Sequence, residues 1–241
     1  MNRGSGHPLA YPLAVTIGAL AVLTAWAPFA DPDQFSALVV VGLGIIGYTG
    51  YRLALALGVL DHGAATRHPV PVRRVRQEHR LESRSWLELR GQGPTRWIPV
   101  YFTPHLIGFT GGTAEFDGRS IVLRESSAAP DNQPTADAGT PPAPSSEIHV
   151  LPAGRVRLGE PGGRLLDNPS RRDATTGERA TTAAKFPRRL LLDAQSVVAA
   201  PFIALLWVYI AEGGLPAFIG ACCVAAAAAI WLSAIRGSDP S

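Results

Sequence analysis

Cysteine is almost absent from this chain, which holds only the adjacent pair Cys222 and Cys223. Neighbouring cysteines in an apolar run do not have the spacing of a disulfide framework or of a zinc site, so we expect both to be small packing residues of a helix. Histidine is also uninformative, because no histidine falls in a metal-binding spacing such as H-E-x-x-H. The histidines are His7, His62, His68, His79, His105 and His149.

The sequence likewise lacks the motifs of enzymes. It has no Walker-type phosphate loop, and no serine, cysteine or aspartate stands in a nucleophile motif. We therefore predict a non-enzymatic protein with no cofactor and no metal ion. Nucleic acid is excluded as a partner, since the formal net charge is only +3 and no nucleic-acid-binding motif accompanies the arginines.

Charge is missing from long stretches at both ends of the chain. Residues 11–30, 35–51, 194–211 and 213–235 carry none, and the second stretch stays apolar to residue 60 apart from Arg52. A helix needs about 20 apolar residues to cross a membrane. We predict transmembrane helices at about 11–30, 35–60, 191–211 and 215–235. They form an N-terminal hairpin in residues 1–60 and a C-terminal hairpin in residues 191–241.

Basic residues are absent from the two short turns, which hold Asp31, Asp33 and Glu212 instead. Arginines flank the other helix ends, so the positive-inside rule predicts a multi-pass protein of the inner (plasma) membrane. Both termini and the central region 61–190 would be cytoplasmic. An alternative is a signal peptide ending at Ala27, although Pro28 directly after the cut disfavours cleavage.

The central region divides by composition. Residues 61–84 form a basic juxtamembrane segment, and residues 85–160 alternate apolar and polar side chains between turn signals such as Asp117-Gly118. We predict a small all-β domain, a barrel or a sandwich, inserted between the helical hairpins. The Pro-rich stretch 126–146 reads as a disordered insertion in this domain, and residues 161–190 read as a polar linker.

Glycines of the second apolar run allow two readings. Gly42, Gly44 and Gly47 have the G-x-G-x-x-G spacing of a dinucleotide-binding turn, and Asp61 follows at a suitable distance. No further β-α-β repeat follows, however, and a charge-free segment precedes the motif. Small residues let membrane helices approach closely, so we favour a helix-packing interface made of Gly42, Gly44, Gly47 and Gly50.

Arginines gather on both sides of the central region, next to the predicted membrane helices. Juxtamembrane clusters of this kind attract anionic lipids. We predict contacts with anionic lipid or with a partner at Arg73, Arg74, Arg76, Arg188 and Arg189. The alternative is that these arginines serve only as the orientation signal.

The stretches RWIPVYFTPHLIGF (96–109) and HVLPAGRVRLGE (149–160) resemble a pattern in small actinobacterial membrane proteins. In those proteins, helical hairpins flank a cytoplasmic β domain. The group includes the lipid-uptake coordinators, which are accessory subunits of mycobacterial Mce-type lipid importers. The resemblance covers about residues 95–160 and the overall layout, and it carries over no catalytic residue.

Together these features predict a non-enzymatic accessory or scaffolding subunit. Its partner would be a larger integral membrane complex, which the resemblance makes a cell-envelope lipid transporter of the Mce type. Two other hypotheses remain open: a membrane-bound sensor whose β domain binds anionic lipid or a small ligand, and an oligomeric transporter. Intramembrane acidic groups, which ion-coupled transport usually needs, are absent from the apolar runs.

Overall fold

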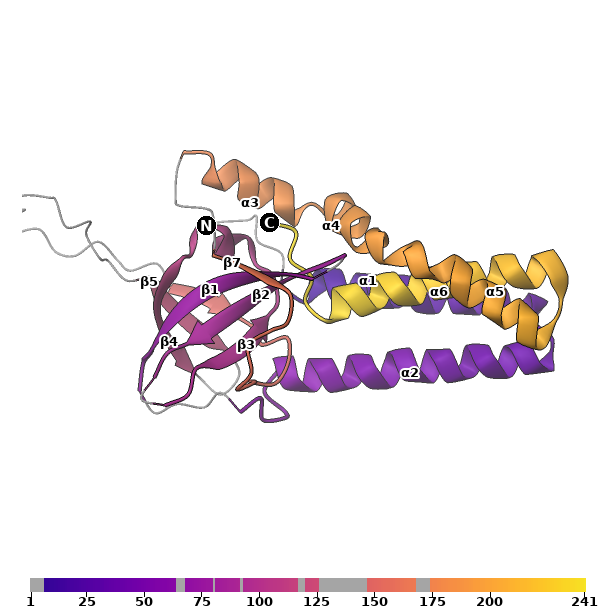
Figure 1. Cartoon of the computed structure of the whole chain (residues 1–241), viewed down its shortest axis with the longest axis horizontal. Coiled ribbons are helices and arrows are strands. Elements are labelled where there is room, and N and C mark those ends of the chain that lie inside the picture. Colours follow the sequence, from indigo (N-terminus) through magenta and orange to yellow (C-terminus); the bar gives the residue numbers. More distant parts are fainter. Residues whose placement is uncertain are drawn as a thin grey trace, which may run out of the picture.

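The computed structural model describes residues 7–63, 68–79, 81–91, 93–116, 120–125, 147–167 and 174–241. The molecule has two parts side by side, a bundle of long helices and an antiparallel β domain at one end of the bundle (Figure 1). The two short turns between helices lie at the opposite end. The predicted insertion 126–146 and the predicted turn at Asp117-Gly118 lie outside the described residues.

The helices of the bundle confirm the prediction of apolar spans. Within the described residues, four spans are long and apolar enough to cross a membrane: Ala10–Phe29, Pro32–Ala56, Phe186–Ala211 and Gly214–Ile235. The first contains α1 (Ala10–Trp26) and a short 3-10 turn, η1 (Ala27–Phe29), and the second is α2 (Pro32–Ala56). The third joins α4 (Phe186–Asp193), η3 (Ala194–Ala199) and α5 (Ala200–Ala211), and the fourth is α6 (Gly214–Ile235).

The core of the bundle is built mainly by α1 and α6. Tyr11, Val15, Ala19 and Leu23 recur every fourth residue on α1, so they share one buried face of that helix. This face packs with Ile45 of α2 and with Trp231, Ala234 and Ile235 of α6. One buried hydrogen bond fixes α2 against α6, in which the Trp231 indole Nε1–H donates to Thr49 Oγ1 at 3.0 Å.

Short turns end each hairpin. At the first, Asp31 caps α2 by accepting a hydrogen bond from the Gln34 backbone N–H at 2.8 Å. At the second, Glu212, Gly213 and Gly214 all have positive φ, of 57°, 96° and 66°. Glycine adopts such angles at little cost, so two successive glycines allow α5 to reverse directly into α6.

The β domain is an open antiparallel sheet, so the predicted barrel is not supported. Its strands follow the order β3-β2-β1-β4-β5-β6, with β7 also pairing with β1. The strands are β1 (Val70–His79), β2 (Glu82–Leu89), β3 (Arg96–Val100), β4 (Gly111–Phe116), β5 (Ile121–Glu125), β6 (Glu147–Val150) and β7 (Arg164–Asp167). Beyond β6, isolated bridges join Pro152 to Val100 and Arg157 to Trp97.

The longest strand, β1, occupies the segment that composition assigned to a basic juxtamembrane region. It pairs with β2 along nearly its whole length, and on its other side with β4 at Val70–Arg73 and β7 at Val75–Glu78. The sheet thus starts at Val70 and not at 85. Every second residue from Val70 to Arg74 faces the buried side of the sheet. Because one of these inward positions is an arginine, the sequence did not show the alternation of apolar and polar residues that predicts a strand.

The predicted linker 161–190 also holds ordered elements. Besides β7, it contains α3 (Thr176–Ala184) and the first turn of α4. Ala183 of α3 packs with Phe102 and with Ile107, which belongs to η2 (Pro104–Gly108), a 3-10 turn between β3 and β4. Residues 168–173 of this linker lie outside the described part.

The two parts of the molecule are joined by specific contacts. Tyr101 directly follows β3, and its hydroxyl donates a hydrogen bond of 2.9 Å to the carbonyl of Ile235, the last residue of α6. After α6 the chain continues along the sheet, where the Asp239 N–H donates to the Ser83 carbonyl at 2.8 Å. Tyr101 and Ala153 of the β domain pack with Leu9 and Ala56 of the helices. The β domain is therefore seated on the bundle by burial as well as by hydrogen bonds.

Candidate functional site

The glycine motif lies in the middle of a membrane-length helix. Gly42, Gly44 and Gly47 all fall inside α2, which runs unbroken from Pro32 to Ala56. A dinucleotide-binding turn needs a strand that ends at the first glycine, with free backbone N–H groups beyond it. In a continuous helix those N–H groups are already bonded, so the nucleotide alternative is wrong for this segment.

The four glycines do not form one packed face within the chain. A Cβ atom placed on Gly42 would lie 3.6 Å from Leu23 of α1, which makes Gly42 part of a helix contact. Gly44, Gly47 and Gly50 are exposed, and a Cβ atom on any of them would meet nothing within 4 Å. These three glycines, which we call the α2 glycine face, therefore have no neighbouring helix among the described residues.

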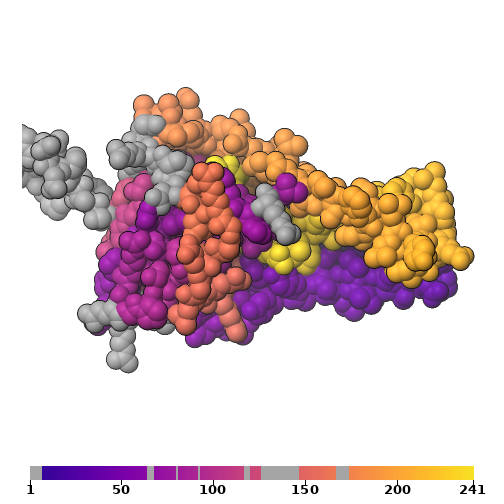
Figure 2. Space-filling view, viewed as in Figure 1, coloured from indigo at the N-terminus to yellow at the C-terminus, as the bar shows by residue number. Residues whose placement is uncertain are grey.

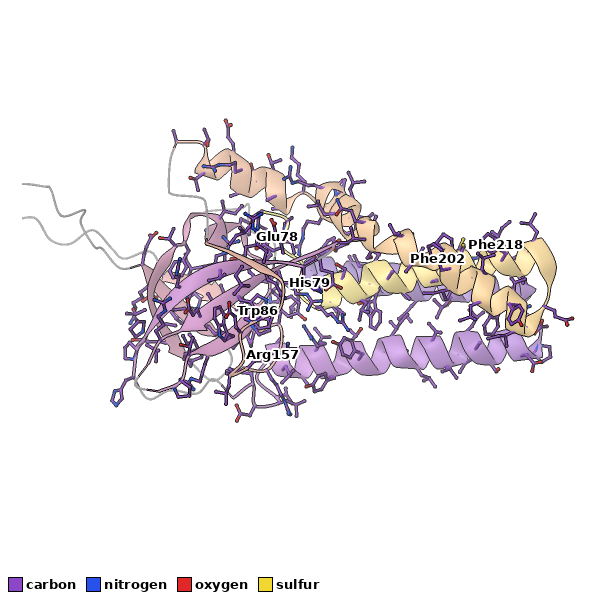
Figure 3. The ribbon with its side chains drawn as sticks, in the orientation of Figure 1. Glu78, His79, Trp86, Arg157, Phe202 and Phe218 are labelled. Atoms are coloured by element: carbon purple, nitrogen blue, oxygen red, sulfur yellow. The ribbon has the colours of Figure 1, made fainter. Side chains whose placement is uncertain are left out.

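An apolar groove runs between α2, α5 and α6, toward the end of the bundle with the short turns. Its volume is about 670 Å³. Leu38 and Val41 of α2, Ile203 and Trp207 of α5, and a run of small residues on α6 line it. Phe202 and Phe218, labelled in Figure 3, come from the same α5 and α6. In the space-filling view the helical half extends beside the β domain as a rod, with α2 along one edge (Figure 2).

Arg74 lies inside the protein and not at a lipid surface. Its guanidinium is 1% exposed and forms an ion pair with Asp239, with Nη2 2.8 Å from Oδ2. It also donates to Ser85 Oγ at 3.1 Å and to the Leu106 carbonyl. The predicted lipid contact therefore fails for Arg74, because the side chain crosses from β1 to the segment after α6.

The other arginines predicted to contact lipid differ in how far they are buried. Arg76 of β1 is partly buried and donates to Glu78 Oε1 at 2.5 Å and to the Ser241 carbonyl. Arg73 of the same strand is also partly buried. Arg188 is exposed at the start of α4, where it remains a candidate for lipid contact. Arg189 is only 7% exposed, with its guanidinium carbon 3.9 Å from the centre of the Tyr11 ring.

A polar cluster that the sequence did not reveal surrounds Asp193 at the end of α4. Its carboxylate accepts hydrogen bonds from Tyr11 Oη of α1 at 2.5 Å, from Ser233 Oγ of α6 at 2.8 Å and from Ser238 Oγ at 3.1 Å. The cluster therefore ties the first, third and fourth spans together where the bundle meets the β domain. Only the apolar context of Asp193 could have drawn attention to it, since its partners lie up to 182 residues away.

The Asp239 carboxyl shows the electrostatic character of the junction. Burial by itself would raise its pKa. The nearby Arg74 guanidinium and hydrogen bonds from Ser85 and Ser241 outweigh burial and hold the pKa of Asp239 below its usual range. The carboxylate is therefore charged and saturated at neutral pH, as expected for a structural ion pair.

One exposed arginine of the β domain, Arg157, lies against an aromatic ring. Arg157 stacks over the ring of Trp86 at 5.5 Å, and the pair is visible in Figure 3. Across the ranges that the structure describes, no group of three or more His, Cys, Asp or Glu residues is placed to hold a metal ion. These features define a protein of the membrane-helix class with a β domain seated on one end of its bundle.

Comparisons with protein-family models, with curated proteins and with solved structures give no match for this chain. The resemblance to lipid-uptake coordinators therefore stays a prediction, and the functional argument rests on the geometry of the chain itself.

Proposed function

We propose that this chain is a non-enzymatic accessory subunit that docks through α2 against a larger integral membrane complex. The resemblance noted above makes that complex a cell-envelope lipid transporter of the Mce type. On this proposal the helices bind the partner within the membrane, and the β domain presents a rigid surface on the cytoplasmic side.

The observation that carries the proposal is the unpartnered α2 glycine face. Gly44, Gly47 and Gly50 expose bare backbone on a helix of membrane length. Apart from the neighbouring turns of α2 itself, no atom of the described residues lies within 4 Å of where their Cβ atoms would stand. Glycine lowers helix propensity by about 1 kcal/mol relative to alanine, so three exposed glycines need a compensating use. Close approach of a second helix is the use that membrane proteins make of such residues.

The polar junction between bundle and β domain supports a scaffolding role. Asp239 and Asp193 both lie there with saturated carboxylates. Asp193 holds the helices together at this end, and Asp239 fixes the segment after α6 to Arg74 and Ser85 of the sheet. A rigid connection would let a partner in the membrane position the β domain.

Gly47→Leu tests the docking face. We expect the substitution to lower the amount of partner that copurifies from native membranes at least about tenfold, because a bulky side chain holds the facing helix away. The measurement is affinity purification of the full chain in mild detergent, followed by quantitative mass spectrometry. The chain should still insert, since leucine is more apolar than glycine.

Gly18→Leu on α1 is the matched control. Gly18 is also exposed within a membrane-length helix with nothing within 4 Å, but it lies outside the α2 glycine face. Partner recovery should stay at the wild-type level for this variant. Equal losses in both variants, or recovery of the wild-type chain only as an isolated monomer, would overturn the proposal.

A further inference from the structure

A small polar cleft lies where the β domain meets the bundle, and it is separate from the α2 glycine face. Its volume is about 50 Å³. Ser83 of β2, Arg189 and Asp193 of α4, and Ser238 after α6 contribute to its wall. A cavity needs about 15 Å³ per water molecule, so the cleft has room for about three waters or for one small oxyanion in their place.

Two side chains of this cleft carry buried donor atoms without a hydrogen-bond partner among the described residues. They are the guanidinium edge of Arg189, made of Nε and Nη2, and the hydroxyl of Ser83. Arg189 is 7% exposed, and its flat face lies 3.9 Å from the Tyr11 ring centre and 5.6 Å from that of Phe102. Burying a charged donor without a hydrogen-bond acceptor is costly, so this edge requires an acceptor that the described part of the chain does not supply.

The geometry of the free edge indicates which acceptor it fits. Nε and Nη2 form the side of the guanidinium that binds two oxygens at once. Elsewhere in this protein, Arg90 uses the same two nitrogens to hold Glu88, at 2.9 Å to Oε1 and 3.1 Å to Oε2. Within the described residues, Arg189 is the one arginine with both of these nitrogens buried and unpaired.

The charges around the cleft favour a ligand with a single negative charge over one with two. Asp193 and Asp239 both line it. The hydroxyls of Tyr11, Ser233 and Ser238 already satisfy the first, and Arg74 and Ser85 satisfy the second. These carboxylates would repel a doubly charged phosphate about twice as strongly as a phosphodiester, which carries a single charge shared by two free oxygens.

The surroundings point to the membrane as the source of that phosphodiester. Arg189 lies near the start of a membrane-length span. Arg188 beside it is exposed, and Phe186 and Leu191 on the same helix are exposed apolar side chains. Cationic and apolar side chains together at a helix end are typical of the headgroup region.

We propose that this cleft binds the phosphodiester group of a phospholipid headgroup, held by the Arg189 Nε/Nη2 edge and the Ser83 hydroxyl. The bound lipid would seal the junction between the β domain and the bundle. This site does not depend on the docking role of α2, because it uses neither α2 nor a partner protein.

The test uses the full chain purified in a maltoside detergent, which contains no phosphate. Dihexanoyl phosphatidylglycerol is titrated by calorimetry, alongside inorganic phosphate and dihexanoylglycerol, which lacks the phosphodiester. We expect saturable binding of the phosphatidylglycerol and none of the neutral lipid. If inorganic phosphate binds as tightly as the phosphatidylglycerol, the cleft is a site for oxyanions in general, and the proposal of a phospholipid ligand is overturned.

Variants separate the site from general electrostatic attraction and from misfolding. Arg189→Gln should weaken binding at least about tenfold, and Ser83→Ala about threefold, from the loss of charged and neutral hydrogen bonds respectively. Arg155→Gln is the matched control, because Arg155 is an exposed arginine that does not line the cleft. This variant should bind within about twofold of wild type. Arg189→Lys keeps the positive charge near Tyr11 but has no two-nitrogen edge, so it should also lose affinity.

Ser83→Ala provides the decisive test, because it removes a hydroxyl that makes no hydrogen bond to any described residue. If the cleft holds only water, this variant should retain wild-type stability and leave phosphatidylglycerol binding unchanged. That result, or equal losses in the Arg155 and Arg189 variants, would overturn the proposal.

Discussion

Asp239→Ala should lower the free energy of unfolding by about 3–5 kcal/mol, the usual cost of breaking a buried ion pair by removing one partner. The substitution would leave the Arg74 guanidinium, which is 1% exposed, without its 2.8 Å ion-pair partner. The same carboxylate accepts a hydrogen bond from Ser85 Oγ at 2.5 Å, so that hydroxyl would lose its acceptor too. Urea unfolding of the full chain in detergent, followed by tryptophan fluorescence, measures the loss.

A double-mutant cycle provides the control for this prediction. Arg74→Met removes the charge that Asp239→Ala would strand, so the double variant should be less destabilised than the sum of the single variants. Additive effects would contradict the assignment of a coupled buried pair. Hydrogen exchange of the backbone N–H at position 239, which donates to the Ser83 carbonyl at 2.8 Å, would report whether the segment after α6 detaches.

Low pH should destabilise the protein in the same way as Asp239→Ala, because the pKa of Asp239 is lowered in the folded state. Burial opposes the charged form, but Arg74 prevails and the pKa of Asp239 lies below its usual range. Since the unfolded chain binds the proton more readily, the stabilisation is complete above about pH 4 and is lost as the pH falls through the folded pKa. The Asp239→Ala variant should lack this part of the acid dependence.

Gly237→Ala should destabilise the same junction by about 2 kcal/mol or more, because two costs combine. Gly237 follows α6 with a φ of +84°, a region that side chains other than glycine rarely adopt. A Cβ atom there would lie 2.9 Å from Ala153 Cβ and 3.3 Å from the Val100 carbonyl oxygen. The sheet would have to move away from the end of α6, which thermal unfolding of the full chain would register.

Gly159→Ala is the matched control for Gly237→Ala. Gly159 is exposed in the segment after β6, and a Cβ atom there meets nothing within 4 Å. The free energy of unfolding of the Gly159→Ala variant should stay within about 0.5 kcal/mol of the wild-type value, as for most surface substitutions. Equal effects of the two substitutions would contradict the steric argument.

Sequence patterns were reliable where a single physical demand acts along a continuous segment. A membrane-length apolar run has to satisfy its backbone as a helix, so the spans could be placed within a few residues. The third span began earlier than expected, at Phe186, because Arg188 and Arg189 made its first turn look like linker. Arg189 is buried there, with its charge against an aromatic ring.

Sequence patterns failed where a polar or charged side chain occupies a buried position because it binds a residue far away in the sequence. Arg74 occupies an inward position of β1, and this concealed the strand and suggested a lipid contact. Its partner Asp239 lies 165 residues further along the chain, so no local window could pair them. The polar cleft likewise could not be predicted, because folding alone brings together Asp193, Ser83 and the free edge of Arg189.

The sequence by itself determined that this chain has membrane-length helices in two hairpins around a β domain, because apolar length and alternation act locally on the backbone. The glycines of α2 were also visible, but only the tertiary structure decided which of them contact α1 and which stay bare. The structure likewise decided which arginines are buried and that a polar cleft forms at the junction of bundle and sheet. Charges and hydrogen-bonding groups take their role from their neighbours in space, and folding alone brings those neighbours together.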